Sequence, residues 1–200
     1  MKKNSISVIL YSILLILIGS QYAQAEAAKW QFDTAHSSVY FDIRHIYSTV
    51  RGHFPEYSGT FLFDPKNPAT AKLEMEIKVK NIFTDDQKRD KHLKSKDFFD
   101  AGKYPVMTFE STGFEPTGDQ EYLVSGKLTV KGNSKDISFP LSYLGEKEHP
   151  LQKGQIVAGF SGHLVLDRLE YQVGDGKFYK MGVVDKDVAI TISFEMLRNE

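Results

Sequence analysis

The chain of 200 residues contains no cysteine at all. This absence excludes disulfide bonds, catalytic thiols, thiolate zinc sites and iron–sulfur clusters together. The chain also lacks a low-complexity tract, an internal repeat and a linker rich in glycine, serine or proline, so we expect one domain rather than several. Without disulfides such a domain must be held together by its apolar core, for which the chain is long enough.

An excess of one charge is absent too. The chain has 25 basic and 26 acidic residues, and its formal net charge is −1. This balance argues against nucleic acid as a partner, because proteins that bind nucleic acid carry a clear basic surface. Basic residues do cluster at positions 88–96, but Asp86, Asp90 and Asp97 interleave with them. We interpret the cluster as a solvated helix face rather than a phosphate-binding patch.

Long apolar runs are missing except for one at the N-terminus. Two lysines precede an apolar run over residues 6–18, and small residues follow at Ala23 and Ala25. The run is shorter than the roughly 20 residues that span a bilayer, which favours a secretory signal peptide over an uncleaved membrane anchor. We therefore predict a signal peptide over residues 1–25, cleavage after Ala25, and a mature domain over residues 26–200 that is periplasmic or secreted.

The chain does contain strict alternation of apolar and polar residues. Between Lys72 and Lys80, charged and apolar residues alternate over nine positions, a period of two that is typical of a half-buried β-strand. The same alternation recurs along the chain, and turn signals such as Gly132-Asn133 separate the segments. The predicted strands are 37–46, 49–54, 57–64, 71–80, 105–113, 121–131, 135–145, 155–167 and 187–197.

The pattern predicts an all-β protein whose strands share one apolar face. Two arrangements cover such a face: two sheets packed on each other, or an antiparallel barrel, which at about eight strands is filled with side chains or holds a small ligand. Only the segment at about 84–100 departs from the alternation. Thr84 and Gln87 fit a capping box there, so we predict a helical insertion that packs on one end of the barrel.

Residues that could support catalysis or bind metal are scattered. The six histidines show no spacing typical of metal ligands on a helix or hairpin. His45 shares the strand face of Phe41 and Ile43, so we expect it to point inward as a hydrogen-bonded core residue or a ligand contact rather than a metal ligand. Neither a nucleophile elbow nor a pair of facing carboxylates stands out, and we predict no catalytic residue.

Glycines inside the predicted strands say more about function than the histidines and carboxylates do. They lie at positions 52, 59, 126 and 159. Such glycines allow a sheet to curve or a ligand to approach it closely. The inward face supplies the candidates for lining a cavity. These candidates are Phe41, Ile43, His45, Phe61, Phe63, Met75, Ile77, Phe109, Leu128, Phe139 and Ile190.

Several motifs occur in a fixed order between Trp30 and about Phe194. The most specific runs from His92 to Asp100 and reads His-Leu-Lys-Ser-x-Asp-Phe-Phe-Asp. Others precede and follow it, among them His-Ser-x-Val-x-Phe-x-Ile-x-His, which starts at His36, and Gly-x-Leu-Thr-Val-x-Gly, which starts at Gly126. In this order the motifs resemble the YceI-like, polyisoprenoid-binding family.

The resemblance implies a lipocalin-like antiparallel barrel that holds a long-chain polyisoprenoid or a fatty-acid-like lipid for transport, storage or sequestration. It implies no catalytic residue and no cofactor apart from the bound lipid, with the membrane serving only as the lipid's source. The resemblance leaves open whether the protein forms a homodimer. The alternatives are a periplasmic enzyme or metal-binding protein that uses His45, and a stress-response interaction module.

The chain departs from the family pattern near residues 168–183, where Gln172 replaces a usual glycine. If that end is the cavity mouth, Lys177 and Lys180 are candidates for contact with an anionic head group; otherwise they are ordinary loop lysines.

Overall fold

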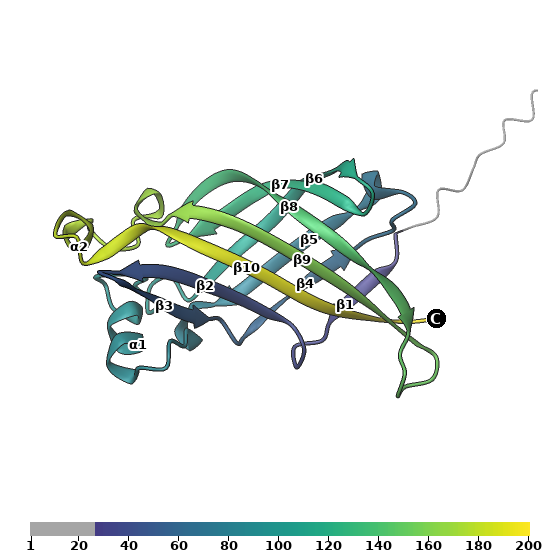
Figure 1. Ribbon diagram of the computed structural model, residues 1–200, viewed down its shortest axis with the longest axis horizontal. Helices are drawn as coiled ribbons and strands as arrows, with labels where there is room; N and C mark the ends of the chain where they lie inside the picture. The colour runs from purple at the N-terminus through teal and green to yellow at the C-terminus, as the bar shows by residue number, and fades with distance from the viewer. Residues whose placement is uncertain (1–26) are drawn as a thin grey trace, which may run out of the picture.

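In the computed structural model, which describes residues 27–200, ten strands form one antiparallel sheet (Figure 1). The predicted signal peptide lies outside the described residues. The strands are β1 (Lys29–Phe32), β2 (Ser38–His45), β3 (Ser48–His53), β4 (Tyr57–Leu62), β5 (Lys72–Lys78), β6 (Val106–Gly118), β7 (Glu121–Val130), β8 (Asn133–Glu148), β9 (Gln155–Asp167) and β10 (Val184–Asn199). Two helices, α1 (Gln87–Lys94) and α2 (Lys177–Lys180), and three single 3₁₀ turns at Pro68–Thr70, Val79–Asn81 and Arg168–Tyr171 complete the described elements.

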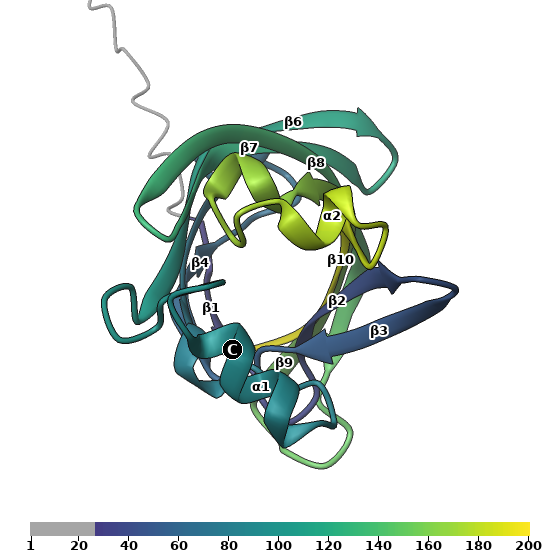
Figure 2. The same ribbon diagram turned by 90° about the vertical axis from the view of Figure 1, so that its left-hand side faces the viewer.

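Eight of these strands close into a barrel, because β1 pairs with β4 on one side and with β10 on the other. One edge of β10 has two neighbours: β1 pairs with it at Met196 and Leu197, and β2 pairs with it between Val184 and Ser193. The β2–β3 hairpin therefore continues the wall beside β10 (Figure 2). The predicted all-β barrel of about eight strands is confirmed, and the alternative of two packed sheets is excluded.

All nine predicted strands are present, and their ends shift by a few residues. The sequence prediction missed β1, which has only four residues and too little alternation to be recognised. The β7–β8 hairpin was predicted around Gly132-Asn133, but its two turn residues are Lys131 and Gly132, with φ of 51° and 76°. Positive φ at both positions matches the twist of the flanking strands, which is why a two-residue turn forms there.

The predicted helical insertion is present, although its predicted cap is wrong. Helix α1 begins three residues after Thr84, and Asp86 caps it by accepting a hydrogen bond from the Arg89 backbone N–H at 2.8 Å. Thr84 is buried instead and donates to the Asp90 carboxylate at 2.6 Å. No helix within residues 27–200 is long and apolar enough to cross a membrane.

Two of the strand glycines make room for protein atoms rather than for a ligand. A Cβ at Gly52 would lie 2.3 Å from the ring of Phe41 on the neighbouring strand. A Cβ at Gly59 would lie 1.9 Å from the carbonyl oxygen of Glu74. Both distances are far below van der Waals contact, so at these positions glycine permits close strand packing.

The end of the barrel near the C-terminus is filled with aromatic side chains. The ring of Phe63 lies 5.1 Å from that of Phe160 and 5.3 Å from those of Tyr122 and Tyr143, between centroids. The Trp30 indole N–H donates to the Phe63 carbonyl at 3.1 Å. These contacts close one end of the barrel, because edge-to-face rings pack densely and the buried indole donor has its partner.

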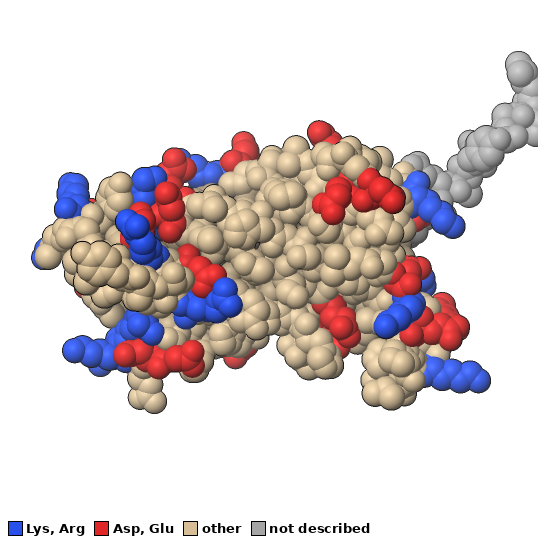
Figure 3. Space-filling model, viewed as in Figure 1, with Lys and Arg blue, Asp and Glu red and all other residues tan. Residues whose placement is uncertain are grey.

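The opposite end of the barrel carries α1 and α2 (Figures 1 and 2). A second apolar cluster, which includes Phe41, Phe54, Phe98 and Met107, lies there. On the face shown in Figure 3, charged side chains gather toward the two ends and leave the middle of the barrel wall largely uncharged. The two ends therefore differ in packing: one is closed by aromatic rings, and the other is bordered by helices and loops.

Candidate functional site

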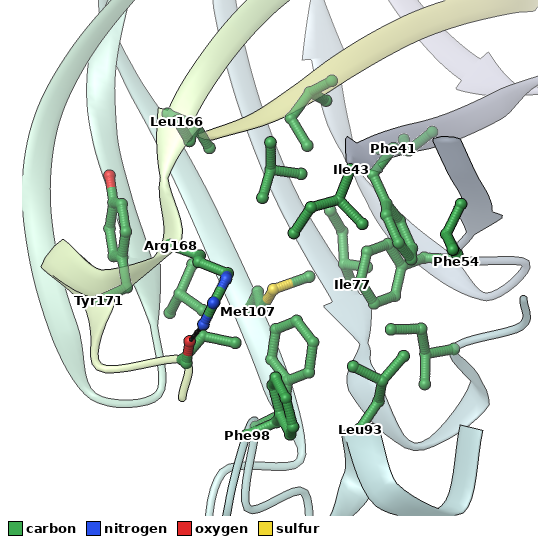
Figure 4. Close-up of a pocket in the computed structure, with 18 of the residues that line it drawn as sticks. Phe41, Ile43, Phe54, Ile77, Leu93, Phe98, Met107, Leu166, Arg168 and Tyr171 are labelled. Atoms are coloured by element: carbon green, nitrogen blue, oxygen red, sulfur yellow. Dashed lines mark hydrogen bonds between the residues drawn. The ribbon is translucent and has the colours of Figure 1, made fainter. Parts of the chain in front are cut away.

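A cavity of about 570 Å³ lies between the closed aromatic end and α1 (Figure 4). Its wall is almost entirely apolar and comes from β2, β3 and β5 to β10, with α1 and the segment around α2 at the mouth. This volume falls within the range of about 300–1,000 Å³ that is usual for small-molecule sites. Nine of the predicted lining residues line this cavity: Phe41, Ile43, His45, Met75, Ile77, Phe109, Leu128, Phe139 and Ile190.

Phe61 and Phe63, which were predicted to line the cavity, do not line it. They share the inward strand face of the lining residues, but both side chains are packed inside the closed aromatic end. Their rings lie 5.6 Å apart, and Phe61 also meets Phe160 at 4.9 Å. The prediction fails for these two because strand alternation tells inside from outside but does not tell a cavity wall from a filled core.

Sequence analysis also missed several lining residues. Leu164 and Leu166 on β9 follow the inward face of Phe160 at every second position, so the alternation itself could have identified them. Phe54 and Phe98 come from loops and turns near the mouth, and Phe178 comes from the short helix α2. No strand period applies to such residues, so the alternation could not identify them.

Several lining side chains point inward and are nevertheless only partly buried. Examples in the middle of the wall are Ile43 on β2, Ile77 on β5, Leu128 on β7 and Ile190 on β10. An inward aliphatic residue of a filled barrel would be fully buried. Their remaining exposure faces the cavity, so the protein's own side chains leave this space unfilled.

Polar lining residues gather at the mouth and are mostly basic. Arg168 is the most buried of them, with 7% of its surface exposed. Its Nε donates to the Asp185 carbonyl at 2.8 Å, and its Nη1 donates to the Val173 carbonyl at 2.6 Å (Figure 4). Burial lowers the pKa of the Arg168 guanidinium. The charged and titratable lining residues are His45, Asp86, Lys88, Arg89, His92, Arg168 and Tyr171.

Hydrogen bonds and ring contacts fix the rim of the mouth. Arg89 on α1 donates from Nε to the Thr84 hydroxyl at 2.7 Å and also bonds the Thr84 carbonyl. The His92 ring meets the edge of Phe98 at 5.0 Å, and Phe98 in turn lies parallel to Phe178 at 6.2 Å. These contacts join the α1 segment to the α2 segment, so the two sides of the rim hold each other in place.

The predicted polar candidates lie at or outside this rim. His45 borders the cavity at the end of β2. Lys177 and Lys180 are exposed on α2 and do not line the cavity, so their predicted contact with a head group stays a prediction.

One group with metal-ligand chemistry is present among residues 27–200, and it does not include His45. Potential ligand atoms of Asp33, His36 and Glu195 lie within 4.8 Å of one another. The His36 ring bonds the Asp33 carboxylate at 2.7 Å, which raises the pKa of His36 and lowers that of Asp33. None of the three lines the cavity. The His36–Asp33 bond and a backbone hydrogen bond from the Asp33 N–H to the Glu195 carbonyl at 2.9 Å account for their proximity.

The model of the YceI-like domain matches residues 30–196. The chain belongs to the YceI-like family. Among its curated relatives is a UPF0312 protein of Pseudomonas savastanoi pv. phaseolicola, 34% identical over 98% of this chain and 97% of the relative. A UPF0312 protein of Pseudomonas fluorescens is 37% identical over 86% of this chain and 88% of the relative.

Several solved structures have the same barrel fold as this chain. BcnA of Burkholderia cenocepacia has a TM-score of 0.73 at 28% identity and covers 84% of this chain and 99% of its own. The YCEI protein of Campylobacter jejuni has a TM-score of 0.68 at 31% identity, with 76% and 87% covered. A domain from Saccharophagus degradans, described as polyisoprenoid-binding, has a TM-score of 0.62 at 16% identity, with 85% and 98% covered, and shares the fold.

Proposed function

We propose that this YceI-like protein is a non-enzymatic binding protein that holds a long-chain polyisoprenoid or a similar apolar lipid in its barrel. The observation that carries the proposal is the cavity of about 570 Å³, whose wall is apolar and whose polar lining residues gather at the mouth. A molecule with a long apolar tail and a small polar end matches this distribution. The tail enters the barrel and the polar end stays at the rim.

The affinity of such a carrier comes from burial. Removing apolar groups from water contributes roughly 0.8 kcal/mol per CH₂-sized group, so a few isoprene units offset the free-energy cost of association. The partly exposed wall residues Ile43, Ile77 and Leu128 gain contacts at the same time, because an unfilled apolar cavity forfeits dispersion interactions. The depth of the cavity then sets the preferred chain length.

The choice of a polyisoprenoid among apolar chains has its own basis. It rests on the family resemblance and on the shared fold with the Saccharophagus degradans domain. A fatty-acid-like lipid would satisfy the same apolar wall. We therefore treat the prenyl chain as the first ligand to test and the fatty acid as the second.

Binding without catalysis fits the residues around the cavity. In the part of the chain that the structure describes, no serine, threonine or cysteine lines it. The basic groups at the rim surround no nucleophile that they could activate, whereas an enzyme needs reactive groups that converge on the substrate. Export remains part of the proposal because of the predicted N-terminal signal peptide, which would place the carrier in the periplasm or outside the cell.

The test combines extraction with titration. Protein purified from its native host is extracted with organic solvent, and the extract is examined by mass spectrometry for a prenyl or fatty-acyl lipid. Purified protein is then titrated with fluorescent prenyl chains of increasing length. We expect affinity to rise with chain length until the cavity is full.

A matched pair of variants links uptake to the cavity wall. Ile77→Asp places a carboxylate on the wall and should abolish uptake, because the charge would have to be buried beside the ligand. Lys78→Asp places the same side chain on the next residue of β5, which does not line the cavity, and should leave uptake unchanged. A carrier role is refuted if the extract contains no lipid and no prenyl chain saturates the protein.

A further inference from the structure

Large apolar side chains are exposed next to the cavity mouth. Ile46 and Tyr47 form the turn of the β2–β3 hairpin, and Tyr47 is fully exposed. Tyr179 and Met181 lie in and just after α2, and Met181 is 61% exposed. The Ile46 N–H donates to the Val183 carbonyl at 3.0 Å, which joins the two segments. We call these four side chains, Ile46, Tyr47, Tyr179 and Met181, the mouth patch.

The fold alone does not account for the residues in this turn. Ile46 has a φ of 53°, in the left-handed region that β-branched residues strongly avoid. A two-residue hairpin turn with positive φ at its first position is normally built with glycine at that position. Here the turn instead carries two large apolar side chains, of which Tyr47 is fully exposed and Ile46 about half exposed. Strain of this kind typically marks a functional position.

Lysines lie on both helices at the end of the barrel that carries the mouth patch. Arg44, just before the turn, is paired with Asp185 at 3.6 Å. By contrast, five lysines on the two helices of this end have no ion-pair partner within residues 27–200. Figure 3 shows basic side chains that project from this end of the barrel. These lysines are Lys88, Lys91 and Lys94 on α1 and Lys177 and Lys180 on α2.

We propose that the mouth patch docks the protein on an anionic lipid bilayer and turns the cavity mouth toward the membrane. Aromatic and aliphatic side chains enter the boundary between head groups and acyl chains, while flanking lysines attract anionic head groups. This inference rests on the proposed function, because an apolar ligand that leaves or enters a bilayer needs the mouth at the membrane surface. It goes beyond that function by assigning a second binding surface with its own residues.

The experiment measures binding to vesicles by flotation. Mature protein is mixed with neutral phosphatidylcholine vesicles, or with vesicles that contain phosphatidylglycerol as well, at low and at high salt. Binding should require the anionic lipid and should weaken as salt rises, because salt screens the lysines. Each lysine near a charged surface contributes a factor of about five, so Lys177→Gln with Lys180→Gln should weaken binding about 25-fold.

The variant of the turn preserves the fold by design. Ile46→Gly with Tyr47→Asn installs the residues that the turn geometry favours, so the barrel should be at least as stable as the natural chain. We expect this variant to lose vesicle binding at least about tenfold. The control is Leu151→Ser, which removes a side chain that is 88% exposed between β8 and β9, at the opposite end of the barrel, and should bind vesicles normally.

The outcomes separate this inference from the carrier function. The docking surface is disproved if the natural protein does not bind anionic vesicles, or if the turn variant binds them as well as the natural protein does. If the turn variant and the lysine variant both bind anionic vesicles as the natural protein does, another surface of the protein makes the contact. The turn variant should still take up a prenyl chain supplied in detergent, and failure of the natural protein to do so would count against the carrier function alone.

Discussion

Enlarging a side chain on the cavity wall should reduce ligand affinity without harming the fold. Ile77 on β5 is suited to this test because it is partly exposed, faces the cavity and lies between the two apolar clusters (Figure 4). Ile77→Phe keeps an apolar residue with high strand propensity and places a ring in the unfilled space. The variant then differs from the natural protein mainly in the cavity volume that is available to the ligand.

The expected magnitudes follow from the volume that the ring takes. A phenyl ring displaces about two or three CH₂-sized groups of a long ligand, each worth roughly 0.8 kcal/mol, so affinity for a chain that fills the cavity should fall by about 2 kcal/mol, or about thirtyfold. A short chain that leaves the displaced region empty should bind almost as before. Stability should stay equal or rise by up to about 1 kcal/mol, because filling a cavity adds contacts.

The assay measures prenyl-chain affinity by fluorescence and stability by urea unfolding on the same samples. The matched control is Met196→Phe, because Met196 is completely buried in the closed aromatic end and does not line the cavity. Overpacking there should cost about 1–3 kcal/mol of stability and leave affinity unchanged. The reasoning fails if Ile77→Phe destabilises the protein as much as the control, or if long and short chains lose affinity equally.

Three further predictions concern other parts of the molecule. Phe160→Ala, at the centre of the closed aromatic end, should lower the free energy of unfolding by about 3–5 kcal/mol in urea with no change in prenyl affinity of the folded protein. Burial raises the pKa of Tyr171 to about 12, above the value of about 10 in the unfolded chain, so its stabilising contribution is complete below pH 10 and is lost as pH rises to 12. Alkaline unfolding followed by circular dichroism should show this loss, and Tyr171→Phe should reduce it. N-terminal sequencing of the exported protein should start at Glu26, and recovery of Met1 would contradict the signal peptide.

Strand alternation made most of the fold predictable. The faces of β2, β5 and β7 could be assigned because a half-buried strand must place its apolar residues on one side. The same rule could not locate the cavity within the barrel. Phe41 and Phe63 look alike in the sequence, but one lines the cavity and the other is enclosed by Tyr122, Tyr143 and Phe160. Which inward residues meet one another depends on packing across the barrel.

The mouth could be predicted least. Arg168 is buried and bonded to main-chain carbonyls, an environment that no spacing of side chains indicates. The start of α1 shows a related difficulty. Thr84 and Asp86 are both good caps, and the choice between them depended on the buried hydrogen bond of Thr84 to Asp90.

The closed sheet also limits how copies of this protein can associate. An open sheet has two edges whose free N–H and C=O groups can pair with another chain, a common start of aggregation. Here β4 is paired with β1 only at Phe61 and Leu62, and closure of the barrel leaves β3 as the end strand of the described sheet. That strand has six residues and carries the charge of Arg51, and its last residue, His53, already pairs with Phe83. Association through added strands is therefore limited to the short edges of β3 and β4.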